Sequence, residues 1–152
     1  MIKVNVEINK ESWHKKIKNP KNYLNKRLEK ISKILKIYKK KNIIFTILLT
    51  SSHEMKRLNK KFRKKNKPTD VLSFPAFSYK NLRLLKDKKI YIGDIAVSYE
   101  IINIRSKNNN FFKEFDNVWV HGFLHLLGYD HMKNKDYLKM LKLEKKIINL
   151  IT

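Results

Sequence analysis

The sequence HGFLHLLGYDH, residues His121–His131, contains three of the five histidines in the chain. His121 and His125 are four residues apart, and residues at this spacing share one face of a helix. The apolar residues before and between them are typical of a mostly buried helix. Gly128 suits the left-handed position that ends a helix, and the chain reversal after it would let His131 reach the same point in space.

Three neutral imidazoles with an open fourth position are typical of a catalytic zinc site, whereas structural zinc sites are closed by four protein ligands. We therefore expect His121, His125 and His131 to bind one zinc ion per chain, and the ligands are also compatible with Ni²⁺ or Cu²⁺. The alternative is a buried helix whose histidines are hydrogen-bonded to backbone carbonyls.

The spacing also matches the metzincin protease pattern H-E-x-x-H-x-x-G-x-x-H, with Gly122 in place of the glutamate. That glutamate is the general base of a metalloprotease, so its absence disfavours a peptidase. A glycine inside a helix costs about 1 kcal/mol relative to alanine. We therefore expect another part of the chain to approach the backbone closely at Gly122.

The histidine stretch and two further motifs resemble the YbeY family of bacterial rRNA maturation factors, in the family's order and over essentially the whole chain. The further motifs are Leu58-Asn59 with Arg63 leading into Pro68–Pro75 (PTDVLSFP), and Ile92–Ile95 (IGDI). Phe62 stands where tyrosine is common in the family. Lys64 and Asn66 replace the usual Gly and Asp after the arginine, which makes a different loop shape possible.

The resemblance implies a metal-dependent endoribonuclease that cuts single-stranded RNA in rRNA processing, at the 3′ end of 16S rRNA, and acts in ribosome quality control on the small ribosomal subunit. Arg63 would clamp the scissile phosphate, which its planar fork of N–H donors suits. The sequence does not assign the general base: metal hydroxide, the RNA 2′-OH acting as its own nucleophile, or Asp130 acting through a water could each serve. The alternatives are a non-catalytic RNA-binding assembly factor with a structural metal and, less favoured, a metallopeptidase.

The chain has 152 residues and no cysteine, which predicts one domain over residues 1–152 without disulfides. The longest apolar run, Ile43 to Leu49, is far shorter than a membrane span. Residues 1–10 alternate apolar and polar residues and show no signal-peptide pattern. We expect a cytoplasmic protein with no membrane partner. The sequence does not predict its oligomeric state.

The formal net charge is +23, from 36 Lys+Arg against 13 Asp+Glu. This charge suits a polyanionic partner such as RNA, because each phosphate contact releases counterions. The basic residues are mostly lysines, however, and a lysine-rich composition on solvated positions would give the same number. Arg63 is therefore a better functional candidate than any individual lysine.

Alternation with period two predicts strands, and apolar spacing of three to four residues predicts helices. We expect strands at 2–8, 43–49, 71–74 and 90–97 and an irregular segment at 76–89. We expect helices at 21–39, after Ser51, at 98–105, from 111 through the histidines and at 134–150. Ser51 followed by Glu54 fits a capping box that opens the second of these helices, and we expect one of the asparagines just before residue 111 to cap the histidine helix. Strands and helices alternate without βαβ regularity. The predicted class is α+β, with a small mixed sheet of about four strands, several helices and the metal site on a buried helix.

Some polar and aromatic residues have two interpretations. Gly93 within a strand indicates a bulge or a close backbone contact. Asp94 lies in an apolar strand, where a carboxylate is costly to bury without a partner, so we expect it to brace the histidine helix or to support a ligand histidine. Tyr79, Phe77 or Tyr91 could stack on RNA bases, or belong to the core. We interpret the remaining histidines, His14 and His53, as surface residues.

Overall fold

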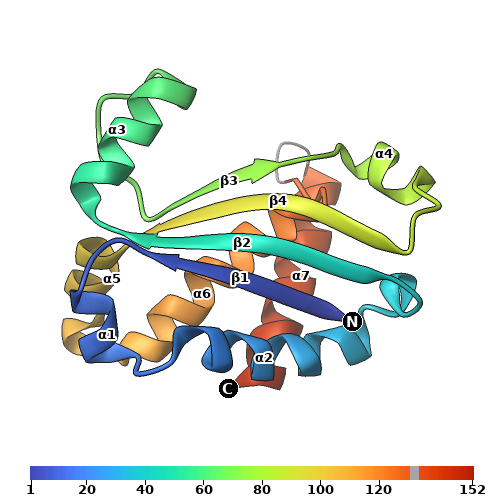
Figure 1. The fold of residues 1–152 in the computed structure, drawn as a ribbon, viewed down its shortest axis with the longest axis horizontal. Coiled ribbons are helices and arrows are strands. Elements are labelled where there is room, and N and C mark those ends of the chain that lie inside the picture. The colour runs from blue at the N-terminus through green and yellow to red at the C-terminus, as the bar shows by residue number, and fades with distance from the viewer. Residues whose placement is uncertain (131–133) are drawn as a thin grey trace.

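A computed structural model describes residues 1–130 and 134–152 and shows helices packed against a four-stranded sheet (Figure 1). The strands are β1 (Ile2–Ile8), β2 (Asn42–Thr50), β3 (Val71–Pro75) and β4 (Lys89–Ser98). The helices are α1 (Ser12–Lys16), α2 (Pro20–Ile34), α3 (Ser52–Arg63), α4 (Tyr79–Leu84), α5 (Tyr99–Arg105), α6 (Phe111–Leu126) and α7 (Asn134–Ile151), with 3₁₀ turns at Lys36–Tyr38 and Ser106–Asn108. Of the helices in these described ranges, none has the length and apolar character needed to cross a membrane.

The sheet has the strand order β1-β2-β4-β3, which places β3 at one edge. β1, β2 and β4 are parallel, and β3 is antiparallel to β4, so the predicted mixed sheet is confirmed. Successive side chains point to opposite faces of a strand. Phe45 and Ile47 of β2 enter the main core against α2, α6 and α7. On the other face, Met55 of α3 packs with Leu72 and Ala96.

Gly93 shifts the strand pairing in the middle of β4. Its φ angle is +131°, and a Cβ atom there would lie 2.2 Å from the carbonyl oxygen of Phe74. The register of β2 with β4 shifts at the same point, so the predicted bulge and close backbone contact are confirmed. One extra residue turns the following side chain to the opposite face. Asp94 is therefore exposed on the face away from α6, where it accepts a hydrogen bond from the Tyr91 hydroxyl, and both predicted roles for Asp94 are wrong.

The helix predictions hold with three corrections. Helix α1 was not predicted. The helix predicted at 21–39 ends at Ile34, because Leu35 (φ −87°, ψ 66°) leaves the helical conformation and a 3₁₀ turn follows. The segment predicted to be irregular at 76–89 contains α4, which begins where the Ser78 side chain accepts from Asn81 N–H at 3.2 Å. The predicted cap at Ser51 is confirmed, since its hydroxyl accepts from Glu54 N–H at 3.2 Å.

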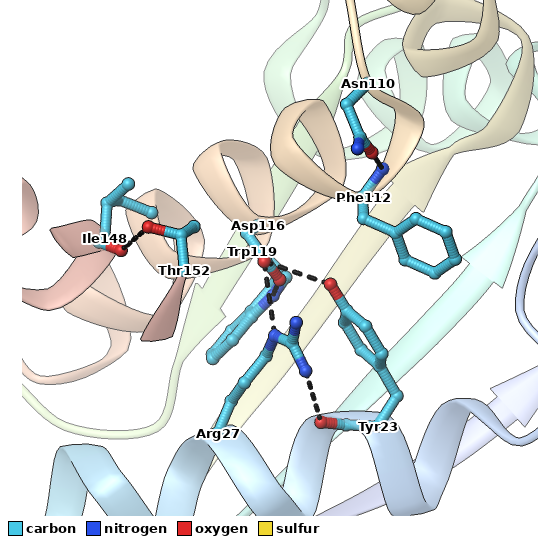
Figure 2. Close-up of polar contacts among 8 residues, drawn as sticks. All are labelled: Tyr23, Arg27, Asn110, Phe112, Asp116, Trp119, Ile148 and Thr152. Atoms are coloured by element: carbon cyan, nitrogen blue, oxygen red, sulfur yellow. Dashed lines mark hydrogen bonds and ion pairs between the residues drawn. The ribbon is translucent and has the colours of Figure 1, made fainter. Parts of the chain in front are cut away.

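A buried polar cluster joins α6 to α2 (Figure 2). Asp116 of α6 is 1% exposed and accepts hydrogen bonds from the Tyr23 hydroxyl (3.0 Å), Arg27 Nε (3.2 Å) and Trp119 Nε1 (2.8 Å). The Arg27 guanidinium also lies 3.5 Å from the centre of the Tyr23 ring. Burial raises the pKa of Asp116, and the donors Trp119, Arg27 and Tyr23 oppose that rise. A buried carboxylate is tolerated where its partners remain in place, so the cluster fixes the orientation of α6 on α2.

Candidate metal centre

Helix α6 carries the first two histidines of the predicted site. The residue that caps its N-terminus is Asn110, whose side-chain oxygen accepts from Phe112 N–H at 2.8 Å, so the predicted asparagine cap is confirmed (Figure 2). Most of its residues are buried, Trp119 and Phe123 completely. His121 and His125 are half-buried, because they point from one side of the helix out of this core.

Gly122 allows the sheet to pack on the helix backbone beside His121. A Cβ atom at this position would lie 3.0 Å from Val71 Cγ2 and 3.1 Å from both Ile95 Cγ2 and Ser73 Oγ. The Ser73 hydroxyl also donates to the Gly122 carbonyl at 3.1 Å. The expected close approach at Gly122 is confirmed, and a side chain at this position, such as the glutamate of a metalloprotease, would require the packed residues to shift.

The chain turns sharply at the end of α6. Gly128 has φ +90°, its N–H donates to the His125 carbonyl at 3.0 Å, and Tyr129 N–H donates to the Leu124 carbonyl at 3.1 Å. These paired bonds are those of the Schellman motif, in which a left-handed residue ends the helix. The predicted helix end at Gly128 is confirmed. The third predicted ligand, His131, lies outside the described residues, so its place in the site stays a prediction.

The imidazoles of His121 and His125 face each other. Their ring centroids are 4.7 Å apart, and the two Nε2 atoms are separated by 3.1 Å. Two nitrogens that ligate one tetrahedral zinc at 2.0–2.1 Å lie about 3.3 Å apart. The spacing between the Nε2 atoms therefore fits two ligands of the same ion. Within residues 1–130 and 134–152, no group of three His, Cys, Asp or Glu side chains is arranged to hold a metal ion.

The other nitrogen of each ring contacts an acceptor. His125 Nδ1 lies 2.9 Å from the carbonyl oxygen of Tyr129, just after the helix-ending turn. His121 Nδ1 lies 3.3 Å from Oε2 of Glu144, a residue of α7. A carbonyl oxygen or a carboxylate can only accept, so these partners favour a hydrogen on Nδ1 of each ring and leave Nε2 as the nitrogen that would bind a metal. Hydrogen bonds of this kind orient metal-ligating histidines and raise their basicity.

Glu144 also affects the charge of His121. Its hydrogen bond, assisted by its negative charge and by that of Asp70, raises the pKa of His121, and burial opposes the rise. Glu144 was not predicted from the sequence to be part of the site. A signal was present, because Glu144 is an acid in the apolar series Met140, Ile147 and Ile151 on the buried side of α7.

Arg63, the predicted phosphate clamp, lies at the last turn of α3 and is exposed. Its Nη2 donates to the carbonyl oxygen of Ser73 at 2.9 Å. The side chain of Ser73 bonds to Gly122, the neighbour of His121. The fold therefore links Arg63 to the histidine helix through one residue of the edge strand β3.

The loop after Arg63 keeps a compact shape in spite of the lysine at position 64. Lys64 adopts the left-handed conformation (φ 57°, ψ 29°) and ends α3. The buried side chain of Asn59 donates to the Lys67 carbonyl at 2.9 Å. Glycine would adopt this conformation at no steric cost. The replacement of glycine by Lys64 therefore changes the strain and charge of this turn, while the helix end itself is retained.

Asp70, in the PTDVLSFP motif, stabilises the start of β3. One carboxylate oxygen accepts from Val71 N–H at 2.7 Å, and the other accepts from Arg105 at 2.5 Å. His14 and His53 are exposed, which agrees with their interpretation as surface residues. Asp130 is exposed immediately after the turn that ends α6.

Comparisons with known proteins agree on one family. The family model described as endoribonuclease YbeY matches residues 7–152. The endoribonuclease YbeY of Pelagibacter ubique is 46% identical over 154 residues, covering 99% of this chain and 97% of that protein. The Ehrlichia canis endoribonuclease YbeY is 36% identical over 151 residues, covering 98% and 92%. A solution structure of a Thermotoga maritima protein has a TM-score of 0.62 at 31% identity and covers 99% of this chain and 89% of that one.

Proposed function

The chain belongs to the YbeY family of endoribonucleases, and from this premise we propose that it is a zinc-dependent enzyme that hydrolyses phosphodiester bonds of single-stranded RNA. The proposed substrate is ribosomal RNA near the 3′ end of 16S rRNA, and the proposed partner is the small ribosomal subunit in the cytoplasm. The observation that supports the metal chemistry most directly is the 3.1 Å spacing of the Nε2 atoms of His121 and His125.

His121, His125 and His131 are the residues that would hold zinc. Both described rings have Nδ1 on an acceptor, Glu144 or the Tyr129 carbonyl, and this fixes the tautomer that a metal ligand needs. A bound zinc ion supplies Lewis acidity toward a phosphodiester. Gly122 stands where a peptidase has its base, so phosphodiester chemistry fits the site better than peptide hydrolysis.

Arg63 is the proposed phosphate clamp. A guanidinium has five N–H donors in a fixed plane, so the bond to Ser73 orients the group and leaves donors for phosphate oxygens. A guanidinium carries a positive charge, so Arg63 would stabilise the negative charge that builds on the phosphate in the transition state.

The test is cleavage of a single-stranded fragment from the 3′ end of 16S rRNA by untagged protein, with and without a chelator. His125→Ala and Arg63→Ala should each reduce cleavage at least about 100-fold, in line with the loss of one charge-stabilising group. His53→Ala and Arg57→Ala are the matched controls, because both lie on the exposed surface of α3. The proposal fails if both site variants cleave like the wild type.

The same experiment separates a catalytic metal from a structural one. A catalytic metal predicts that His125→Ala folds normally, with unchanged circular dichroism, and loses cleavage. Unfolding of this variant, with cleavage unaffected by chelator in the wild type, would instead indicate an assembly factor with a structural metal. The product ends identify the nucleophile, since attack by the RNA 2′-OH leaves a 2′,3′-cyclic phosphate and attack by water does not.

A further inference from the structure

The face of the sheet opposite α6 carries a groove of about 570 Å³. We call it the sheet-face groove and define it by Leu48, Leu58, Phe62, Phe74, Tyr91 and Asp94. Helix α3 forms one wall through Leu58 and Phe62, and the strands form the floor. The volume falls in the range of sites that bind small organic groups, about 300–1,000 Å³.

Aromatic rings are the main apolar surface that this groove exposes. Phe62 is 54% exposed and Tyr91 is 43% exposed. Phe62 meets Phe74 edge-on, with ring centroids 5.2 Å apart and planes at 69°. A large exposed ring beside a second ring is unusual on a surface with nothing to bind. Exposed aromatic residues on an open sheet face are a recurrent platform for stacking unpaired RNA bases.

Charges in and around the groove are separated by sign. Two carboxylates, Glu7 and Asp94, lie on the floor, in a chain whose net charge is +23. The end of α3 and its following loop carry exposed cations, and the ammonium of Lys61 lies 5.3 Å from the Phe62 ring centre. Cations attract phosphates, whereas floor carboxylates repel them and accept from base amino groups. The pattern fits a strand with its bases in the groove and its phosphates over the end of α3.

Asp94 can read a base while it keeps its internal partner. Tyr91 donates to Oδ1 of Asp94, and the same hydroxyl lies 2.6 Å from Thr46 Oγ1. A carboxylate has two oxygens and several acceptor positions, so a base can donate to it at the same time. Cytosine offers an N4 amino donor, whereas uracil has a carbonyl oxygen at that position and would meet the carboxylate unfavourably.

The groove adjoins the candidate metal centre across a single strand. Ser73 and Phe74 are consecutive in the edge strand β3, and they point to opposite faces. Ser73 bonds to Gly122 on the histidine side, whereas Phe74 lines the groove. Arg63 bonds to the Ser73 carbonyl between them. An RNA strand that leaves the groove over this edge would pass Arg63 before it reaches His121.

We propose that the sheet-face groove is a base-binding subsite, in which an unpaired nucleotide next to the cleaved phosphate stacks on Phe62 and Phe74 and donates from its amino group to Asp94. This proposal rests on the proposed function, because it takes single-stranded RNA to be the ligand. It assigns Phe62 and Asp94 to substrate binding, apart from the zinc ligands and Arg63.

The first experiment measures binding without cleavage, so its failure is distinct from that of the nuclease proposal. Fluorescein-labelled octamers of cytidylate and uridylate are titrated with metal-free protein in EDTA at low salt, and anisotropy is recorded. Phe62→Leu should weaken cytidylate binding about tenfold, since stacking is lost while apolar packing is kept. Phe62→Tyr should bind nearly like the wild type. Phe112→Leu, an exposed ring at the far end of α6 from the histidines, should have no effect.

Asp94→Asn tests recognition of the base. The wild type should bind the cytidylate octamer about fivefold more tightly than the uridylate octamer, and the variant should lose this preference, because an amide can donate to uracil as well as accept from cytosine. The proposal is overturned if Phe62→Leu binds both octamers like the wild type. It is also overturned if the preference survives in Asp94→Asn.

The second experiment locates the ligand by amide NMR shifts of metal-free protein with cytidine 5′-monophosphate, inorganic phosphate and an amphipathic Leu/Lys peptide as separate probes. Shifts of Leu48, Phe74 and Ala96 with the nucleotide, but not with phosphate, support the subsite. Shifts confined to the lysines after α3, equal for nucleotide and phosphate, overturn it. Groove shifts that appear with the peptide and not with the nucleotide would show a protein-docking surface, and the proposal would be wrong.

Discussion

Replacing Arg27 by methionine should leave the Asp116 carboxylate buried without its cation. Methionine keeps an unbranched apolar side chain at this position, so the main losses are the charge at 3.2 Å from Asp116 Oδ2 and the guanidinium over the Tyr23 ring. Removing one partner of a buried ion pair costs about 3–5 kcal/mol. The Arg27 side chain is 23% exposed, so water can partly solvate Asp116 in the variant, and we expect the lower figure, about 3 kcal/mol at pH 7.

The loss should depend on pH with a defined sign. Burial already holds the pKa of Asp116 above its ordinary value, and Arg27 is one of the groups that opposes this rise. A carboxyl whose pKa is raised on folding favours the folded state most below its unfolded pKa, about 3.9, and that stability is lost as the pH rises through the folded pKa. Without Arg27 the folded pKa rises further. The destabilisation should therefore be about 3 kcal/mol at pH 7 and about 1 kcal/mol near pH 4, because the raised pKa favours the neutral form of Asp116 at low pH.

Urea denaturation at the two pH values, followed by circular dichroism, measures both quantities. In a thermal melt at pH 7, the melting temperature of the variant should be lower by about 6–12 °C, the shift expected for a chain of this size. Arg57→Met is the matched control, because its partner Glu54 lies on the surface of α3, and it should cost less than about 1 kcal/mol. Adding Asp116→Asn to Arg27→Met should recover stability at pH 7. A loss equal at both pH values, or no recovery in the double variant, would refute the reasoning.

Further variants test the turns and the histidine partners. Lys64→Gly should stabilise the fold by about 0.5–1 kcal/mol, since it removes a side chain from the left-handed position that ends α3, and urea denaturation measures the gain. Gly128→Ala should destabilise it by about 2–4 kcal/mol, because the new Cβ would lie 2.4 Å from Tyr79 Cβ at a φ of +90°, and a thermal melt measures the loss. Glu144→Gln should weaken the proposed zinc site about 10–100-fold, through loss of the carboxylate on His121, as measured by competition with a chromogenic chelator.

Opposite results would be equally informative. A destabilised Lys64→Gly variant would mean that the lysine side chain makes a contact worth more than its backbone strain. An unchanged melting temperature in Gly128→Ala would show that the turn can move away from Tyr79. Zinc affinity unchanged in Glu144→Gln, with Glu114→Gln as the control on α6, would exclude Glu144 as the residue that orients His121.

Much of the fold is predictable from local pattern, because side-chain period and capping are properties of neighbouring residues. Ile2 and Val4 alternate with polar residues and form β1, and the Ser51 hydroxyl caps the helix that it was expected to cap. α4 was not predicted because it has six residues and little apolar periodicity. The helix was predicted to extend to residue 39 because the apolar spacing continues into the 3₁₀ turn after Leu35, although the α-helix itself ends before that turn.

The candidate metal centre likewise has features that local sequence predicts and features that it does not. The four-residue spacing of His121 and His125 fixes their common face, and Gly128 fixes the helix end, so both were read from sequence. Glu144 could not be paired with His121, since it comes 23 residues later on another helix. The predicted roles of Asp94 were wrong because of one bulge. A single extra residue moves every following side chain of the strand to the opposite face of the sheet, and Asp94 therefore lies on the face away from α6.

The sequence by itself determined the elements, the family motifs and the pair of histidines, because each depends on residues a few positions apart on one element. The tertiary structure decided which distant groups meet. Glu144 reaches His121, Ser73 connects Arg63 to the histidine helix, and a groove with aromatic rings opens on the other face of β3. These contacts depend on strand order and on how helices pack on a twisted sheet, and local periodicity carries no information about either.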